Sequence, residues 1–245
     1  MKDLWRYVII AVAVIVSAVV LAMAYTQRSR TSTGVITVTG LGETEFTSDV
    51  IVINGYIEVV NDDTAEAYRI LGNHRATVIE FLKARGVADD EISFAMISTH
   101  KKWQSSYNNG DYQGEIFVGY QMSQTFTIES SNIDGVESAA RELPSLMIED
   151  IAITVQEPMY YYSQLESVKL DLIAEAAADA RERAEKIAAS SGSSLGDLAS
   201  SRAGVFQITA ATGDEEFSAG GSFNLSSRDK KARVTVRSEF YIEKK

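Results

Sequence analysis

The chain has 245 residues, of which 45% are hydrophobic, so it is long enough to bury the core of one or two domains. It contains no cysteine, which excludes disulfides and metal sites built from thiolates. The formal net charge is -11, although residues 1–30 carry four basic side chains against one acidic side chain. The remainder is therefore strongly acidic and repels phosphate backbones, so we expect no binding to nucleic acid.

An apolar stretch over residues 7–25 follows a short polar tail, residues 1–6. A helix over Tyr7 to Ala24 would span roughly 27 Å, close to the thickness of about 30 Å of a bilayer's hydrocarbon layer. This pattern predicts one N-terminal transmembrane helix that serves as an anchor. Ala22-Met23-Ala24 also has the small-x-small form of a signal-peptidase site, so cleavage after Ala24 remains an alternative.

The orientation of this segment is not fixed by charge, because Lys2 and Arg6 on one side balance Arg28 and Arg30 on the other. A short tail before a single early span favours export of the rest of the chain. Residues 26–33 are polar and predict a tether. We therefore expect a single-pass protein of the inner (cytoplasmic) membrane, with its main domain in the periplasm or otherwise outside the cytoplasm.

The main domain, residues 34–245, begins with strand patterns. Val35 to Thr39 alternates apolar and polar residues until Gly40-Leu41-Gly42 interrupts the alternation. Asp49 to Val60 predicts a long strand whose apolar side chains share one face. Asp63 and Glu66 have the spacing of a capping box, which predicts the start of a helix that ends at Arg85.

A β-hairpin is predicted next, from residues 91–103 and 113–129, because Asn109-Gly110 between them tolerates positive φ. A shorter helix at 132–142 and a strand at 148–156 come after it. Apolar residues at steps of three or four predict a long helix over 163–192 that becomes rich in alanine. The pattern ends with a strand at 203–211, a polar loop at 212–228 and a final alternating strand.

These elements form a repeat, because the order strand, helix, strand, hairpin strand occurs at 49–129 and again at 148–243. Two such units would each place a helix on one face of an antiparallel sheet. We therefore predict an α+β fold of antiparallel sheets covered by helices, built from two strand-helix-strand-strand units and preceded by the transmembrane helix.

The titratable side chains form no catalytic or metal-binding pattern. His74 lies on the inward stripe of the first long helix, and His100 stands beside Lys101 and Lys102 near a strand end. Paired histidine spacing and nucleophile-elbow sequences are both missing from the sequence. We predict no catalytic residues, no metal, no cofactor and no enzymatic activity. An enzyme of unrecognised type remains the alternative, and its hallmark would be a deep pocket converging on His74 or His100.

Two groups of aromatic residues are candidates for contacts with other proteins. Trp103, Tyr107 and Tyr112 border the Asn-Gly turn. Tyr160, Tyr161 and Tyr162 are consecutive, so they cannot all face one core. Exposed aromatic patches are common at protein interfaces. Local packing is the competing interpretation for both groups.

A series of short sequence blocks covers nearly all of 34–243. They are Ile36 to Gly42, Phe81 to Val87, Asp90-Glu91-Ile92, Gly119-Tyr120, Ala174 to Ala189, Leu195-Gly196-Asp197 and the closing strand. In content and order these blocks resemble the SIMPL-domain family, which was long catalogued as a domain of unknown function and includes YggE-like periplasmic proteins. Ser48-Asp49 stands where this family usually has Pro-Asp.

The resemblance implies an α+β domain in the cell envelope without an established catalytic activity, and it supplies no catalytic residues. It also implies an envelope or oxidative-stress role, and in some relatives assembly into large hollow rings. Residues and resemblance together predict a membrane-anchored, non-enzymatic envelope protein that forms a homo-oligomeric scaffold through its loop aromatics and edge strands. The alternative is an adaptor or chaperone-like module that binds another envelope protein.

Overall fold

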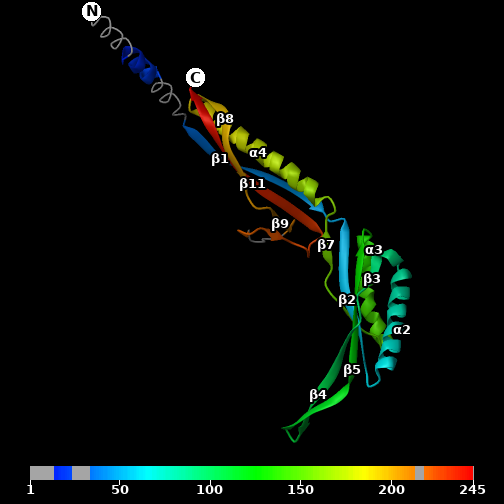
Figure 1. Ribbon diagram of the computed structural model, residues 1–245. Coiled ribbons are helices and arrows are strands. Elements are labelled where there is room, and N and C mark those ends of the chain that lie inside the picture. Colours follow the sequence, from blue (N-terminus) through cyan, green and yellow to red (C-terminus); the bar gives the residue numbers. More distant parts are fainter. Residues whose placement is uncertain (1–13, 24–33, 213–217, 245) are drawn as a thin grey trace, which may run out of the picture. The chain divides into compact units, whose positions relative to one another are not determined.

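The computed structural model describes residues 14–23, 34–212 and 218–244 (Figure 1). This part of the chain is mostly β, with 46% strand in two sheets, so the predicted α+β class is wrong. The difference arises because the strands are longer than predicted. Strand β5, Asp111–Ser130, has 20 residues, and β8, Ser193–Ala203, lies where the sequence predicted a strand only from 203 onward.

The predicted N-terminal transmembrane helix is also corrected. The structure describes a helix over residues 14–23 only, which at 1.5 Å per residue is about 15 Å long. Among the described helices, none is both long enough and apolar enough to cross a membrane. The rest of the predicted segment 7–25, the tail 1–6 and the tether 26–33 lie outside the described residues.

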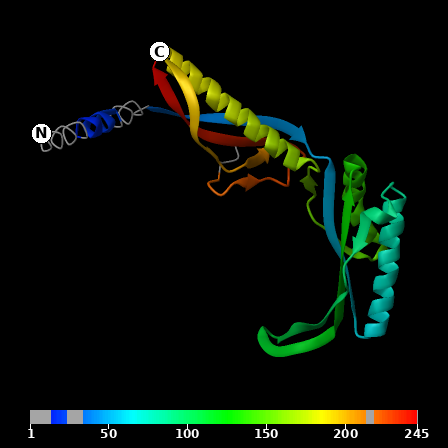
Figure 2. The same ribbon diagram turned by 45° about the horizontal axis from the view of Figure 1, so that its top comes forward.

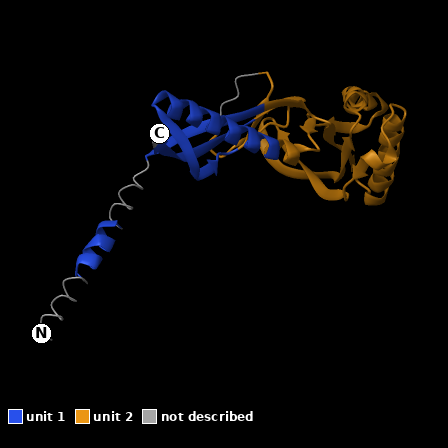
Figure 3. Cartoon of the chain, turned by 90° about the horizontal axis from the view of Figure 1, so that it is seen from above, with its two compact units in different colours: residues 1–43, 170–205, 233–245 blue, residues 44–169, 206–232 orange. Residues whose placement is uncertain are grey.

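The chain divides into two compact units whose segments alternate along the sequence (Figure 3). Unit 1 comprises residues 1–43, 170–205 and 233–245, and unit 2 comprises residues 44–169 and 206–232. The predicted repeat at 148–243 is therefore not a unit of the fold. Its first strand, β6 (Ala152–Val155), pairs with β2 (Val50–Asn61) inside unit 2.

Unit 2 is built on a six-stranded sheet in the order β3-β5-β2-β6, in which β4 also pairs with β5 and β7 also pairs with β2. Every pairing in this sheet is antiparallel. Two short strands, β9 and β10, pair in parallel. The remaining elements are β3 (Ile92–Phe94), β4 (Ser98–Asn108), β7 (Met159–Tyr161), β9 (Gln207–Ala210), β10 (Ser222–Phe223), α2 (Thr64–Lys83), α3 (Ile133–Glu142), η1 (Asp89–Glu91) and η2 (Leu143–Glu149).

The core of unit 2 lies between one face of this sheet and the helices α2 and α3 (Figure 2). Strand β2 alternates as predicted, with every second side chain buried. Its apolar face meets the apolar stripe of α2 and the first turns of α3 in one cluster. Fully buried members of this cluster include Ile51, Ile53, Ile57, Leu71, Val78, Leu82, Phe126, Ile128 and Val136.

Unit 1 packs part of α4 (Leu165–Ser190) against β1 (Val35–Thr47) and pairs β8 with β11 (Asp229–Lys244). Strand β1 does not stop at Gly40, as the sequence suggested, but continues through both glycines. A Cβ at Gly40 would overlap the Ala176 carbonyl, and one at Gly42 would overlap that of Leu172. The two glycines are thus sites where a helix backbone approaches the strand, and the buried alanines of α4 make that approach possible.

Candidate functional site

The β4–β5 hairpin extends beyond the other strands of the unit 2 sheet (Figures 1 and 2). Its tight turn is the predicted one, with Asn109 at φ 51° and Gly110 at φ 93°. Among the described strands, β4 pairs with β5 alone, and all of its residues except Ser106 are exposed. This hairpin therefore offers a free strand edge and two exposed faces.

Three candidate contact residues, Trp103, Tyr107 and Tyr112, lie on this hairpin with 52%, 65% and 58% of their surface exposed. Their rings touch other rings of the hairpin edge to face. Trp103 lies 5.4 Å from Phe117, and Tyr107 lies 5.7 Å from Tyr112, its partner across the strands. The rings are positioned by one another while their outer surfaces remain in water, which is a favourable starting state for an interface.

The free edge of the hairpin carries basic side chains. Lys101 and Lys102 are exposed in β4 and have no salt bridge to any described residue. His100 is also exposed, and its Nε2 lies 2.8 Å from Ser98 Oγ. Lysine on an edge strand opposes pairing with another strand of the same kind.

The second candidate group, Tyr160, Tyr161 and Tyr162, does not form one patch. Tyr160 is buried, with 8% of its surface exposed, whereas Tyr161 and Tyr162 are half-buried. Tyr161 lies opposite Val50 in the pairing of β7 with β2. The Tyr162 ring lies 4.8 Å from that of Phe46.

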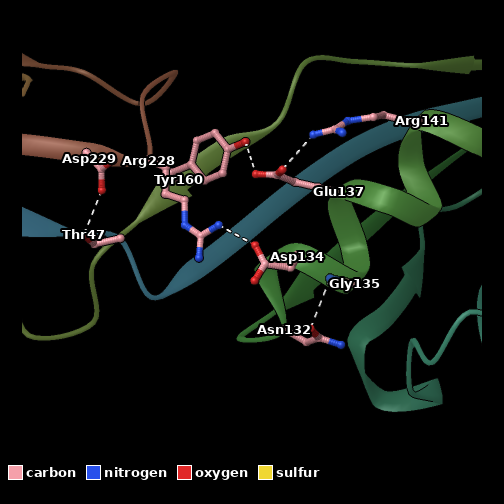
Figure 4. A network of polar contacts seen from close by, with 9 residues as sticks. All are labelled: Thr47, Asn132, Asp134, Gly135, Glu137, Arg141, Tyr160, Arg228 and Asp229. Carbon is pink, nitrogen blue, oxygen red and sulfur yellow. Dashed lines mark hydrogen bonds and ion pairs between the residues drawn. The ribbon is translucent and has the colours of Figure 1, made fainter. Parts of the chain in front are cut away.

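Tyr160 belongs to a polar network around α3 (Figure 4). Its hydroxyl donates to Glu137 Oε1 at 2.6 Å, and Arg141 Nη2 donates to Glu137 Oε2 at 3.0 Å. Burial and the hydrogen bond to this carboxylate raise the pKa of Tyr160 to about 12. Arg228 also reaches α3, since its Nη1 donates to Asp134 Oδ1 at 2.5 Å. The network therefore fixes β7 and the segment before β11 to α3.

A hollow of about 280 Å³, hereafter the proline-lined hollow, lies beside Tyr160. The two prolines of the chain, Pro144 and Pro158, both line it, and no pattern in the sequence indicated this site. Its walls are mostly apolar, with Glu157 among its few charged residues. The lining consists of Ile53, Glu137, Ala140, Arg141, Pro144, Val155, Gln156, Glu157, Pro158 and Tyr160.

A second hollow, of about 370 Å³, lies on the β8–β11 pair of unit 1 and is polar. Arg202 and Arg237 stand directly opposite each other there. Like charges in this position repel each other, so the pair could hold an anion. Glu239 also lines this hollow and accepts from Ser200 Oγ at 3.0 Å, so a carboxylate already stands beside the two guanidinium groups.

Neither histidine lines these two hollows. His74 is half-buried in α2, its Nδ1 has no hydrogen-bond partner among the described residues, and burial lowers its pKa. Among the described residues, no three side chains of His, Asp or Glu gather in a way that could hold a metal ion.

The fold and its exposed surfaces define a mostly β protein with a projecting aromatic hairpin. The chain belongs to the SIMPL family, because the family model, described as a protein of unknown function (DUF541), matches residues 36–240. This confirms the resemblance drawn from the sequence blocks.

Other comparisons give weak similarities. No curated protein matches the chain. A de novo designed protein, Foldit4, is 14% identical with a TM-score of 0.20, covering 44% of this chain and 93% of its own. A putative amidohydrolase/peptidase from Burkholderia cenocepacia is 13% identical with a TM-score of 0.21, and the match covers 55% of this chain and 32% of that protein. A hydrolase from Listeria innocua is 9% identical with a TM-score of 0.22, and the match covers 80% of this chain and 91% of that protein. Similarities of this size carry no conclusion about this chain.

Proposed function

We propose that this protein is a non-enzymatic, self-assembling scaffold of the cell envelope, and that its β4–β5 hairpin is the main contact between copies. The observation that carries the proposal is the exposure of Trp103, Tyr107 and Tyr112 on a hairpin that no other described element covers. Tryptophan and tyrosine are the residues most enriched among the few that dominate the binding free energy of interfaces.

The hairpin has two further properties of a contact surface. Its rings are already held by ring–ring contacts, so binding would cost little side-chain entropy. Ile116 and Phe117 on β5 are also exposed, at 53% and 41%, which extends the apolar surface beyond the three candidate residues. Assembly would remove this apolar surface from water.

The envelope location is supported by membership of the SIMPL family and by the apolar composition of residues 7–24, which suits an export signal. Protease added to intact spheroplasts tests the location directly. We expect the main domain to be digested from outside. Protection that disappears only on lysis would contradict export.

Assembly is tested by analytical ultracentrifugation of the full chain at micromolar concentration. We expect species several times heavier than the 26.8 kDa monomer. The triple variant Trp103→Ser, Tyr107→Ser, Tyr112→Ser should sediment as a monomer with an unchanged circular dichroism spectrum. Tyr68→Ser is the matched control, because Tyr68 is 62% exposed but belongs to α2 and not to the hairpin.

The triple variant keeps the apolar N-terminal stretch, so a difference from the unmodified chain reports on the hairpin alone. An unmodified chain that sediments as a monomer would contradict the scaffold. Cross-linking in cells distinguishes the adaptor alternative: products made only of this chain support the scaffold, and one dominant foreign partner contradicts it.

A further inference from the structure

We propose that Tyr107, at the tip of the hairpin of one copy, inserts its ring into the proline-lined hollow of a second copy. The inference rests on the proposed self-assembly and deepens it by naming the two surfaces that meet. Both surfaces belong to unit 2, and the residues that form them lie within the described part of the chain.

The hollow is large enough to accept one aromatic side chain. Its volume of about 280 Å³ lies just below the range of roughly 300–1,000 Å³ that is usual for small-molecule sites. It exceeds the cavity of about 150 Å³ that is known to accept benzene. Ile53, Ala140 and Val155 supply apolar surface, and the rings of Pro144 and Pro158 add rigid walls.

The hollow also offers polar groups that a tyrosine needs. A buried phenol requires a partner for its hydroxyl. Glu157 and Gln156 line the hollow, are exposed, and have no side-chain partner among the described residues. The hairpin carries charges of both signs, Lys101 and Lys102 on β4 and Asp111 and Glu115 on β5, so its net charge does not oppose entry. The two surfaces are therefore complementary in size and polarity.

A chain cannot fill its own hollow, because the tip of the hairpin lies at one end of β5 (Figures 1 and 2) and residues of the hollow lie beside the other end. Ile53 in the hollow pairs with Ile128 near one end of β5, and Tyr107 pairs with Tyr112 near the other. At about 3.3 Å per residue, the strand between Tyr112 and Ile128 spans roughly 50 Å. Only a tip from a second copy can enter.

The alternative contact between two copies, edge pairing of β4 with β4, is disfavoured by the sequence of that edge. Antiparallel pairing of two identical strands would bring Lys101 and Lys102 of both copies onto neighbouring strands, where like charges repel each other. Insertion of a tip into a hollow joins two different surfaces. Such a contact is heterologous, so it generates a closed ring or an open chain rather than stopping at two copies.

Complementation between two variants tests this geometry. Tyr107→Ser with Tyr112→Ser removes the tip but keeps the hollow, and Ala140→Phe fills the hollow but keeps the tip. We expect the association constant for self-assembly of each full-length variant alone to fall at least tenfold. Their mixture should form a dimer and nothing larger, because one intact tip meets one intact hollow. A mixture that remains monomeric, with both variants folded, would overturn the inference.

Disulfide cross-linking provides a test that does not depend on filling the hollow. The chain has no cysteine, so Asp111→Cys at the tip and Gln156→Cys at the hollow each introduce one thiol. After mild oxidation of mixed single variants, we expect disulfides between the two variants and few within either. Dimers of Asp111→Cys alone would indicate a symmetric contact and overturn the inference. An assembled chain without the mixed disulfide contradicts this inference only, whereas a monomeric unmodified chain contradicts the scaffold itself.

Discussion

Tyr160→Phe tests the polar network that fixes β7 to α3. The substitution removes a hydroxyl that donates to Glu137 Oε1 at 2.6 Å, while Arg141 remains 3.0 Å from the other carboxylate oxygen. Glu137 therefore keeps a partner in the variant. A hydrogen bond to a charged group contributes about 1.5–3 kcal/mol, so we expect the variant to be less stable by about 2 kcal/mol at pH 7.

This difference should shrink at alkaline pH. The pKa of Tyr160 rises from 10.0 to about 12 in the folded protein, chiefly because the side chain is buried and also because it binds Glu137. The unfolded chain releases the phenolic proton near pH 10, whereas the folded chain retains it until about pH 12. The stabilisation is therefore complete below pH 10 and is lost as the pH rises toward 12. At about 1.4 kcal/mol per pKa unit, the loss is about 1.4 kcal/mol by pH 11, one unit above the pKa of the unfolded chain.

Urea unfolding followed by circular dichroism at pH 7, 9, 10 and 11 measures this effect. The two proteins differ only at residue 160, so the difference between their free energies of unfolding isolates Tyr160. We expect that difference to stay constant up to pH 9 and to fall by about two-thirds at pH 11. Tyr112→Phe, which removes an exposed hydroxyl, should follow the unmodified chain throughout. A constant difference between the unmodified chain and Tyr160→Phe up to pH 11 would refute the reasoning.

Three further predictions concern stability and are measured by the same unfolding experiment at pH 7. Gly40→Ala should destabilise the protein by about 1–3 kcal/mol, because the added Cβ meets the backbone of Ala176. Its control is Gly72→Ala in α2, where the added Cβ meets nothing within 4 Å, so this substitution should stabilise the protein by up to about 1 kcal/mol. Asp63→Ala should cost about 1 kcal/mol, since Oδ1 caps the first turn of α2, and an unchanged midpoint would count against this cap. Phe126→Ala should cost about 3–5 kcal/mol because the ring is fully buried; a loss below 1 kcal/mol would contradict the core.

Features that depend on local sequence were predictable. The Asn109-Gly110 turn, the alternation of β2 and the start of α2 at Asp63 all appear in the structure. The predicted capping box forms only in part. Asp63 accepts from the backbone amides of Ala65 and Glu66, but the Glu66 side chain binds Arg69 and does not return to the Asp63 amide. A neighbouring cation thus competes successfully for the second half of the motif.

Features that depend on distant segments were not predictable. Gly40 and Gly42 resemble an interruption of the strand because their role depends on α4, which lies more than 120 residues further along the chain. The strands are also longer than expected, because pairing partners such as β11 supply hydrogen bonds to weakly alternating segments such as β8. The predicted fold class was therefore wrong even though many individual elements were correctly located.

The two aromatic groups show the same difference between features set by local sequence and features set by distant segments. Trp103, Tyr107 and Tyr112 lie on a hairpin whose partner strand is close in sequence, so exposure there follows from local pattern. The surroundings of Tyr160 depend on pairing of β7 with β2, about 110 residues earlier, and on α3. Those distant contacts bury Tyr160 and leave the hollow beside it. A sequence can therefore indicate the surface that projects from this fold, whereas the surface that receives it exists only once the sheet and α3 have packed together.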